Sequence, residues 1–133
     1  NDTVELKTVG AEVLDGLLVP TLAYPSEGSA MAELYAKYEA ETGSPPESAF
    51  FAAGYDTIYI VKAALEETGG EGGEALRQAL LNLSGVKLST TDNFTMDPDT
   101  RRAKRQVNLL IMEGDEFVFQ KVLPYPKYVP DPY

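Results

Sequence analysis

Residues 45–70, PPESAFFAAGYDTIYIVKAALEETGG, join a stiff loop, a group of aromatic residues and a helical pattern in one segment. Two prolines restrict the backbone at its start. The pattern that follows predicts a helix over residues 54–68, with Ile58, Val61 and Leu65 on one face and a glycine pair at its end. Aromatic residues gathered where an extended segment becomes a helix either fill the core or form the wall of a pocket. The aromatic residues in question are Phe50, Phe51 and Tyr55.

Two further helices flank this segment. In residues 29–43, Ser29 is a candidate N-cap and Gly43 a candidate stop. The apolar positions between them recur at helical spacing and are Met31, Leu34, Tyr35 and Tyr38. Residues 72–85 predict a third helix, which uses Leu76, Leu80 and Leu83.

The remaining segments have the patterns of strands. The short apolar run at residues 17–19 predicts a buried strand that Pro20 ends. Residues 106–122 predict a hairpin around a Glu-Gly-Asp turn. The proline-rich tail, residues 124–133, is expected to be extended. Three helices with several strands indicate an α/β or α+β arrangement.

Composition limits the possible functions. The 133 residues suit one domain, and their net charge of −10 argues against binding to nucleic acid. Histidine and cysteine are absent, which excludes a Ser-His-Asp triad, thiolate metal sites and most zinc sites. No apolar run in the sequence is long enough to span a bilayer. We therefore expect no catalytic residues, no metal site and no cofactor.

Two charged features have simple structural explanations. Asp56 is expected in the first turn of the helix over residues 54–68, where the helix dipole favours a carboxylate. A direct contact with a ligand is the alternative for this residue. The basic run RRAKR, residues 101–105, is expected to be a solvated surface.

Three long stretches of the chain, taken in order, resemble a known family. They are GAEVLDGLLVPTLAY (10–24), MAELYAKYEAETGSPPESAFFAAGYDTIYIVKAALEETGG (31–70) and GEALRQALLNLSGVKLSTTDNFTMDPDTRRAKRQVNLLIMEGDEFVFQKV (73–122). Their order and spacing resemble the C-terminal part of the periplasmic branched-chain amino-acid binding proteins, the type I solute receptors of ABC transporters. Asp15 stands where the family usually has glutamate. The resemblance covers nearly the whole chain apart from the tail.

The resemblance implies a division of the chain between two lobes. Residues 1–22 and 107–123 would be pieces of the second lobe, and residues 25–104 the closing section of the first. Residues 20–25 and 99–106 would be two of the three hinge strands. We expect that Asn1 is not the start of the gene product, because the family's groups that hold the ligand's carboxylate and ammonium lie upstream. The chain alone should then bind amino acids weakly or not at all and should form homo-oligomers through exposed strands.

Candidate ligand-binding residues follow from the resemblance. Phe50 matches the position where the family places an aromatic ring against the ligand's apolar side chain. Core packing is the competing interpretation, with Phe50 and Phe51 alternating across a strand end so that one of them is buried. Tyr55 could reach the cleft or pack in the core. Tyr24, in the first hinge strand, is a further candidate.

The resemblance implies a solute-binding protein of an ABC importer, located in the periplasm or otherwise outside the cytoplasm. Its ligand would be an amino acid or a similar small polar solute, and its partner a membrane permease. Two lobes would close around the ligand without chemical change to it. A ligand-sensing regulatory module with the same fold is the alternative. A small hydrolase is a third possibility, which the absence of histidine and cysteine disfavours.

Overall fold

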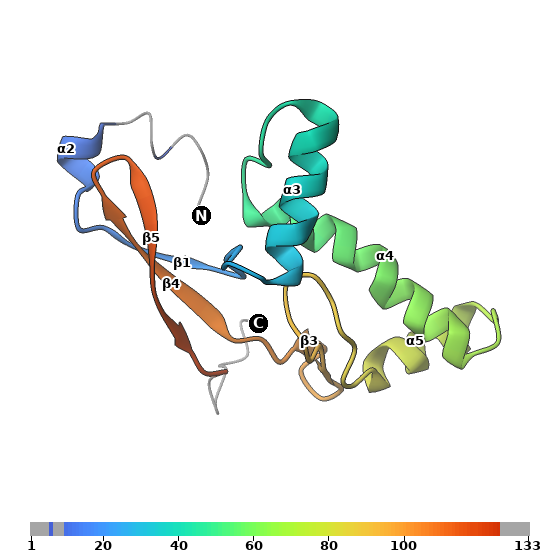
Figure 1. Ribbon diagram of the computed structural model, residues 1–133. Helices are drawn as coiled ribbons and strands as arrows, with labels where there is room; N and C mark the ends of the chain where they lie inside the picture. The colour runs from blue at the N-terminus through green and yellow to red at the C-terminus, as the bar shows by residue number, and fades with distance from the viewer. Residues whose placement is uncertain (1–5, 7–9, 126–133) are drawn as a thin grey trace.

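A computed structural model describes residue 6 and residues 10–125. The predicted extended tail beyond residue 125 therefore lies outside the described residues, as does most of the segment before residue 10. The described elements form two units that lie apart in Figure 1, a small sheet and a group of helices. Two segments of chain join them.

The sheet unit contains three antiparallel strands in the order β1-β4-β5 and one turn of helix. Its elements are α2 (Ala11–Leu14), β1 (Leu18–Thr21), β4 (Val107–Glu113) and β5 (Glu116–Leu123). Strands β4 and β5 are the predicted hairpin, and Gly114 takes a positive φ of 63° in its turn. Val19, Leu110 and Met112 form the buried core of this unit.

Pro20 does not end β1, contrary to the expectation. It pairs in register with Leu109, and the strand continues to Thr21. A proline is tolerated here because β1 is at the edge of the sheet, where not every N–H is needed for the ladder. The predicted burial holds for Val19, whereas Leu18 is 55% exposed.

The helical unit contains α3 (Ala30–Thr42), α4 (Ala49–Glu67), α5 (Gly73–Asn82) and the short pair β2 (Met96–Asp97) and β3 (Arg102–Ala103). Helix α3 confirms both predicted ends, because the Ser29 side chain accepts the Ala32 N–H and Gly43 adopts the left-handed conformation. Helix α5 packs its apolar face against α4 and the segment that follows α5. Figure 1 shows α4 as the long central helix of this unit.

Helix α4 begins five residues earlier than the position predicted, residue 54. Ser48 is its N-cap and accepts the Phe50 N–H through its hydroxyl. Phe50 and Phe51 are therefore in the first helical turn and not at a strand end, so the expected alternation across a strand is wrong. Successive helical side chains point roughly 100° apart, which separates the two rings in another way.

The buried face of α4 also differs from the predicted one. Its buried residues are Ala49, Ala52, Asp56 and Ala64, each with at most 1% exposure, whereas Ile58 is 69% exposed. Small alanine side chains allow α3, α5 and the following loop to approach α4 closely. The expected apolar face with Ile58 is open in the described structure.

The two segments that join the units have other bounds than the expected hinge strands. We call residues 22–29, between β1 and α3, the first crossover, and residues 104–106, between β3 and β4, the second crossover. Asp99 to Arg101 belong to the turn between β2 and β3, and Arg101 has a positive φ of 56°. Asn108 connects to the first crossover by donating a hydrogen bond to the Leu22 carbonyl at 3.4 Å.

Candidate functional site

Phe50 lies beside an apolar hollow between the two units. The hollow has a volume of about 320 Å³ and is lined by β1, both crossovers, the start of β4 and Phe50 itself. The Phe50 side chain is 58% exposed although it is large and apolar. An exposed aromatic ring facing a junction between two units can bind an apolar group by removing its surface from water. We call this space the Phe50 hollow; its lining residues are Pro20, Thr21, Leu22, Phe50, Arg105, Gln106 and Val107.

Phe51 has the other expected role, core packing, only in part. Its ring packs against Tyr38 at 4.5 Å and against Tyr35 at 6.1 Å between centroids. The side chain is half-buried and not a fully buried core residue. Phe51 therefore joins α3 to α4, while Phe50 is directed toward the crossovers.

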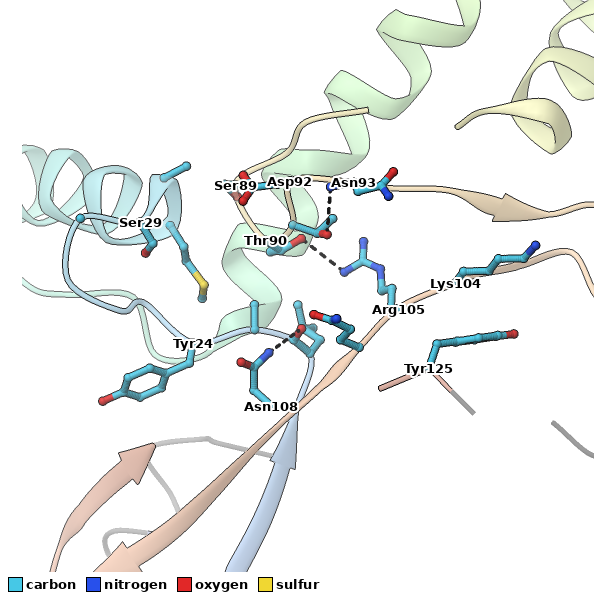
Figure 2. Close-up of a pocket in the computed structure, with 17 residues that line it drawn as sticks. Tyr24, Ser29, Ser89, Thr90, Asp92, Asn93, Lys104, Arg105, Asn108 and Tyr125 are labelled. Atoms are coloured by element: carbon cyan, nitrogen blue, oxygen red, sulfur yellow. Dashed lines mark hydrogen bonds between the residues drawn. The ribbon is translucent and has the colours of Figure 1, made fainter. Parts of the chain in front are cut away.

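A larger polar cavity of about 600 Å³ also lies at the junction (Figure 2). Both crossovers contribute to it, together with the start of α3 and the loop of residues 89–93. Lys104 and Arg105 bring two positive charges to this cavity in a chain whose net charge is −10. Asp92 supplies a negative charge to the same lining.

Arg105 lies between the two spaces, because it lines both the Phe50 hollow and the polar cavity. Its Nη1 donates to the Thr90 hydroxyl at 3.3 Å, a bond drawn in Figure 2. The guanidinium also lies over the Phe94 ring, 5.5 Å from its centroid. Burial lowers the pKa of Arg105, and the charge of Asp56 opposes that shift. The expectation of a solvated basic run is therefore wrong at Arg105.

Asp56 has a structural role that local sequence reasoning did not find. It is fully buried in the middle of α4 and not in its first turn. Its carboxylate accepts two hydrogen bonds from Ser89 and two from Thr90, through the backbone N–H and the hydroxyl of each. The partners come from a distant loop, so no local pattern indicates them. The carboxylate holds that loop against α4 and does not point into either space.

Tyr24 lies in the first crossover and lines the polar cavity, not the Phe50 hollow. Its ring stacks on Phe119 of β5 with centroids 5.7 Å apart. In Figure 2 this ring points away from Thr90 and Arg105. Tyr24 therefore connects the first crossover to the sheet unit.

Tyr55 lies apart from both Phe50 and Tyr24. It lines a separate hollow between α3, α4 and residues 87–92, with a volume of about 360 Å³. Its hydroxyl is 2.9 Å from that of Tyr59, and the hydrogen bond with Tyr59 raises the pKa of Tyr55. The three residues predicted for the ligand site thus line three different spaces.

The described part of the chain offers little for metal binding. Residue 6 and residues 10–125 contain no group of three or more acidic residues placed to hold a metal ion. The Asp97 side chain closes the turn at residues 97–100, because it accepts hydrogen bonds from the N–H groups of Asp99 and Thr100. Among the described helices, none has the length and apolar character needed to cross a membrane.

Comparison with known families gives one match over most of the chain. A family model described as periplasmic binding protein matches residues 2–115. No curated protein sequence matches the chain.

Solved structures share the fold at low sequence identity. A leucine-binding protein from Thermotoga maritima has a TM-score of 0.79 at 22% identity, over 92% of this chain and 35% of that protein. The closed form of a leucine-, isoleucine-, valine-, threonine- and alanine-binding protein from Brucella ovis has a TM-score of 0.70 at 19% identity, over 93% and 35%. An ABC transporter substrate-binding protein from Desulfitobacterium hafniense in complex with Leu has a TM-score of 0.65 at 23% identity, over 82% and 32%.

The chain thus spans about a third of the length of each of these structures. The mixture of helices and strands observed here is the corresponding part of their fold. It confirms the predicted fold class, part of a type I periplasmic-binding-protein fold with three helices and strands.

Proposed function

This chain belongs to the periplasmic binding protein family, and from that premise we propose that it is part of the solute receptor of an ABC importer. Members of this family bind solutes and are not enzymes, so the chain is a binding protein. The ligand that we propose is an amino acid with an aliphatic side chain. The two units would close on it, and the closed form would then dock on a membrane permease outside the cytoplasm.

The Phe50 hollow carries this proposal. Phe50 comes from the helical unit, Pro20 and Val107 come from the sheet unit, and the crossovers lie between them. A change in the angle between the units must alter the space in front of Phe50. Closure would bury this ring together with the apolar part of a ligand, and each square ångström of apolar surface removed from water contributes about 25 cal/mol.

The relatives support an amino-acid ligand. The Thermotoga maritima protein is named for leucine, the Brucella ovis protein for leucine, isoleucine, valine, threonine and alanine, and the Desulfitobacterium hafniense protein holds Leu. An aliphatic side chain matches the apolar lining of the Phe50 hollow. A charged side chain would lose its hydration there. The lining has no acidic partner for a basic side chain, and Arg105, the partner for an acidic one, already donates to Thr90 and lies over Phe94.

Calorimetric titration of the complete gene product with a panel of amino acids tests the proposal. We expect saturable binding of leucine, isoleucine or valine and much weaker binding of lysine and aspartate. Binding of none of the aliphatic amino acids, or a preference for the charged ones, would contradict it.

A further inference from the structure

The second crossover is held to the helical unit by contacts on two successive residues. The Lys104 N–H donates to the Thr95 carbonyl at 2.8 Å, and Arg105 donates to the Thr90 hydroxyl. Gln106, the next residue, is exposed, and at Val107 the chain enters β4 of the sheet unit. The connection between the units at this point is therefore a single residue.

The Thr90 side chain connects Arg105 to the interior of the helical unit. Its hydroxyl donates to Asp56, which is fully buried, while accepting from Arg105. Phe94, which lies under the guanidinium, is 4% exposed and belongs to the core around α5. Arg105 thus contacts two anchored groups, a hydroxyl fixed by Asp56 and a core ring. An arginine suits this place because its planar group can stack on a ring and donate at its edge at the same time.

From this arrangement we propose that Arg105 is a positioning residue that fixes the second crossover to the helical unit and confines its bending to Gln106. The inference rests on the proposed function, since a receptor that closes needs a defined pivot. Because Arg105 also lines the Phe50 hollow, the same contacts hold one wall of the hollow in place. Without them, the Lys104 N–H would still hold residue 104 to Thr95, but residues 105 and 106 would bend together and the two units would sample a wider range of angles.

The first crossover is attached in another way than the second, which is held by Arg105 and by the Lys104 N–H. Ala23 is 4% exposed and packs with Met31, Ala49 and Ala52 of the helical unit. Tyr24 stacks on Phe119 of the sheet unit. The first crossover is thus attached to both units, whereas the described contacts of Arg105 are all with the helical unit.

Distance measurement between two spin labels on this chain, mixed with an excess of unlabelled chain so that only distances within one molecule are recorded, tests the proposal. The labels are attached to cysteines introduced by Glu67→Cys in α4 and Lys121→Cys in β5. The sequence has no cysteine of its own, so no other position is labelled. Both positions are exposed. Arg105→Gln should broaden the distance distribution relative to the parent chain. Lys104→Gln, which removes the neighbouring positive charge, should leave its width unchanged.

A second pair of variants changes Thr90, the other partner of the same hydrogen bond. This pair keeps the proposal testable if Arg105→Gln does not fold. Thr90→Val removes the hydroxyl and should broaden the distribution, while Thr90→Ser retains it and should not. Circular dichroism melts establish that each variant is folded at the temperature of measurement. An unchanged width in either Arg105→Gln or Thr90→Val, whichever is folded, overturns the proposal, as does equal broadening in Lys104→Gln. The measurement needs no ligand, so its result is independent of the amino-acid titration.

Discussion

Ser89 donates both its backbone N–H and its hydroxyl to one carboxylate oxygen of Asp56, at 2.8 and 2.7 Å, although 33 positions separate the two residues. Thr90 makes the same pair of bonds to the other oxygen. These four donors replace much of the hydration that the carboxylate loses when it is buried. This interaction fixes the loop that carries Thr90, and through Thr90 it reaches Arg105 in the second crossover.

Replacing Asp56 with alanine should destabilise the helical unit strongly. The donors of Ser89 and Thr90 would remain half-buried without their acceptor, and we expect the free energy of unfolding to fall by roughly 3–5 kcal/mol. Urea denaturation followed by circular dichroism measures the change. The control Asp92→Ala removes an exposed carboxylate from the same region and should cost about 0.5 kcal/mol or less. Equal losses in the two variants would show that the Asp56 interaction is not special.

Two glycines should respond to alanine in opposite directions. Gly43 ends α3 with a φ of 82° and donates its N–H to the Glu39 carbonyl, so Gly43→Ala should lower the free energy of unfolding by about 1 kcal/mol. Gly54 lies inside α4 without a positive φ, and an added Cβ would meet nothing within 4 Å. Gly54→Ala should therefore raise the free energy of unfolding by about 0.5–1 kcal/mol. The same urea titration decides both, and a stabilising Gly43→Ala would refute the assignment of the helix end.

A pH titration should detect the hydrogen bond between the hydroxyls of Tyr55 and Tyr59 on α4. The hydrogen bond with Tyr59 raises the pKa of Tyr55 above its ordinary value of 10.0. The stabilisation that the pair provides is therefore complete below that ordinary value and is lost as the pH rises through the raised one. Tyr59→Phe should return the pKa of Tyr55 toward 10.0, as followed by NMR of the ring, whereas Tyr38→Phe should not. An unaltered titration of Tyr55 in Tyr59→Phe would exclude the hydrogen bond as the cause.

Exposed apolar residues at the edge of the sheet should promote association of this chain. Strand β1 is an outer strand, and Leu17 and Leu18 are 39% and 55% exposed. Open edges and apolar patches favour pairing with another copy. We expect light scattering at micromolar concentration to give a dimer or larger species and Leu18→Lys to shift it toward the monomer. A monomeric parent chain would contradict this expectation.

Local signals in the sequence predicted those elements whose ends and turns are chemically marked. Ser29 and Gly43 bound α3 as expected, and the hairpin of β4 and β5 turns at Gly114. The beginning of α4 was predicted too late, although Ser48 was present as a capping residue directly after the prolines. The helical spacing in α4 did not reveal which face is buried, because Ala52 and Ala64 pack closely through their small size.

Among the residues that line the Phe50 hollow, the sequence indicated only Phe50 as a candidate for ligand contact. Phe50 came from the family resemblance, and the structure places it at the junction of the two units. Arg105 and Asp56 were missed as a connected pair because their link through Thr90 joins three distant parts of the chain. Contacts of that kind depend on the tertiary fold and leave no periodic pattern in the sequence.

The role of Phe50 as a wall of the ligand site is the central claim, and titration calorimetry on the complete gene product tests it most directly. Phe50→Ala should weaken binding of the preferred aliphatic amino acid by about 1–3 kcal/mol, the scale of losing one apolar wall. Phe50→Leu should weaken it less, and Val122→Ala, at an exposed apolar position on β5, should not weaken it at all. The melting temperature of Phe50→Ala should remain close to that of the parent, because the ring is more than half exposed. Unchanged affinity together with a large fall in melting temperature would show that Phe50 is a packing residue and would contradict the account.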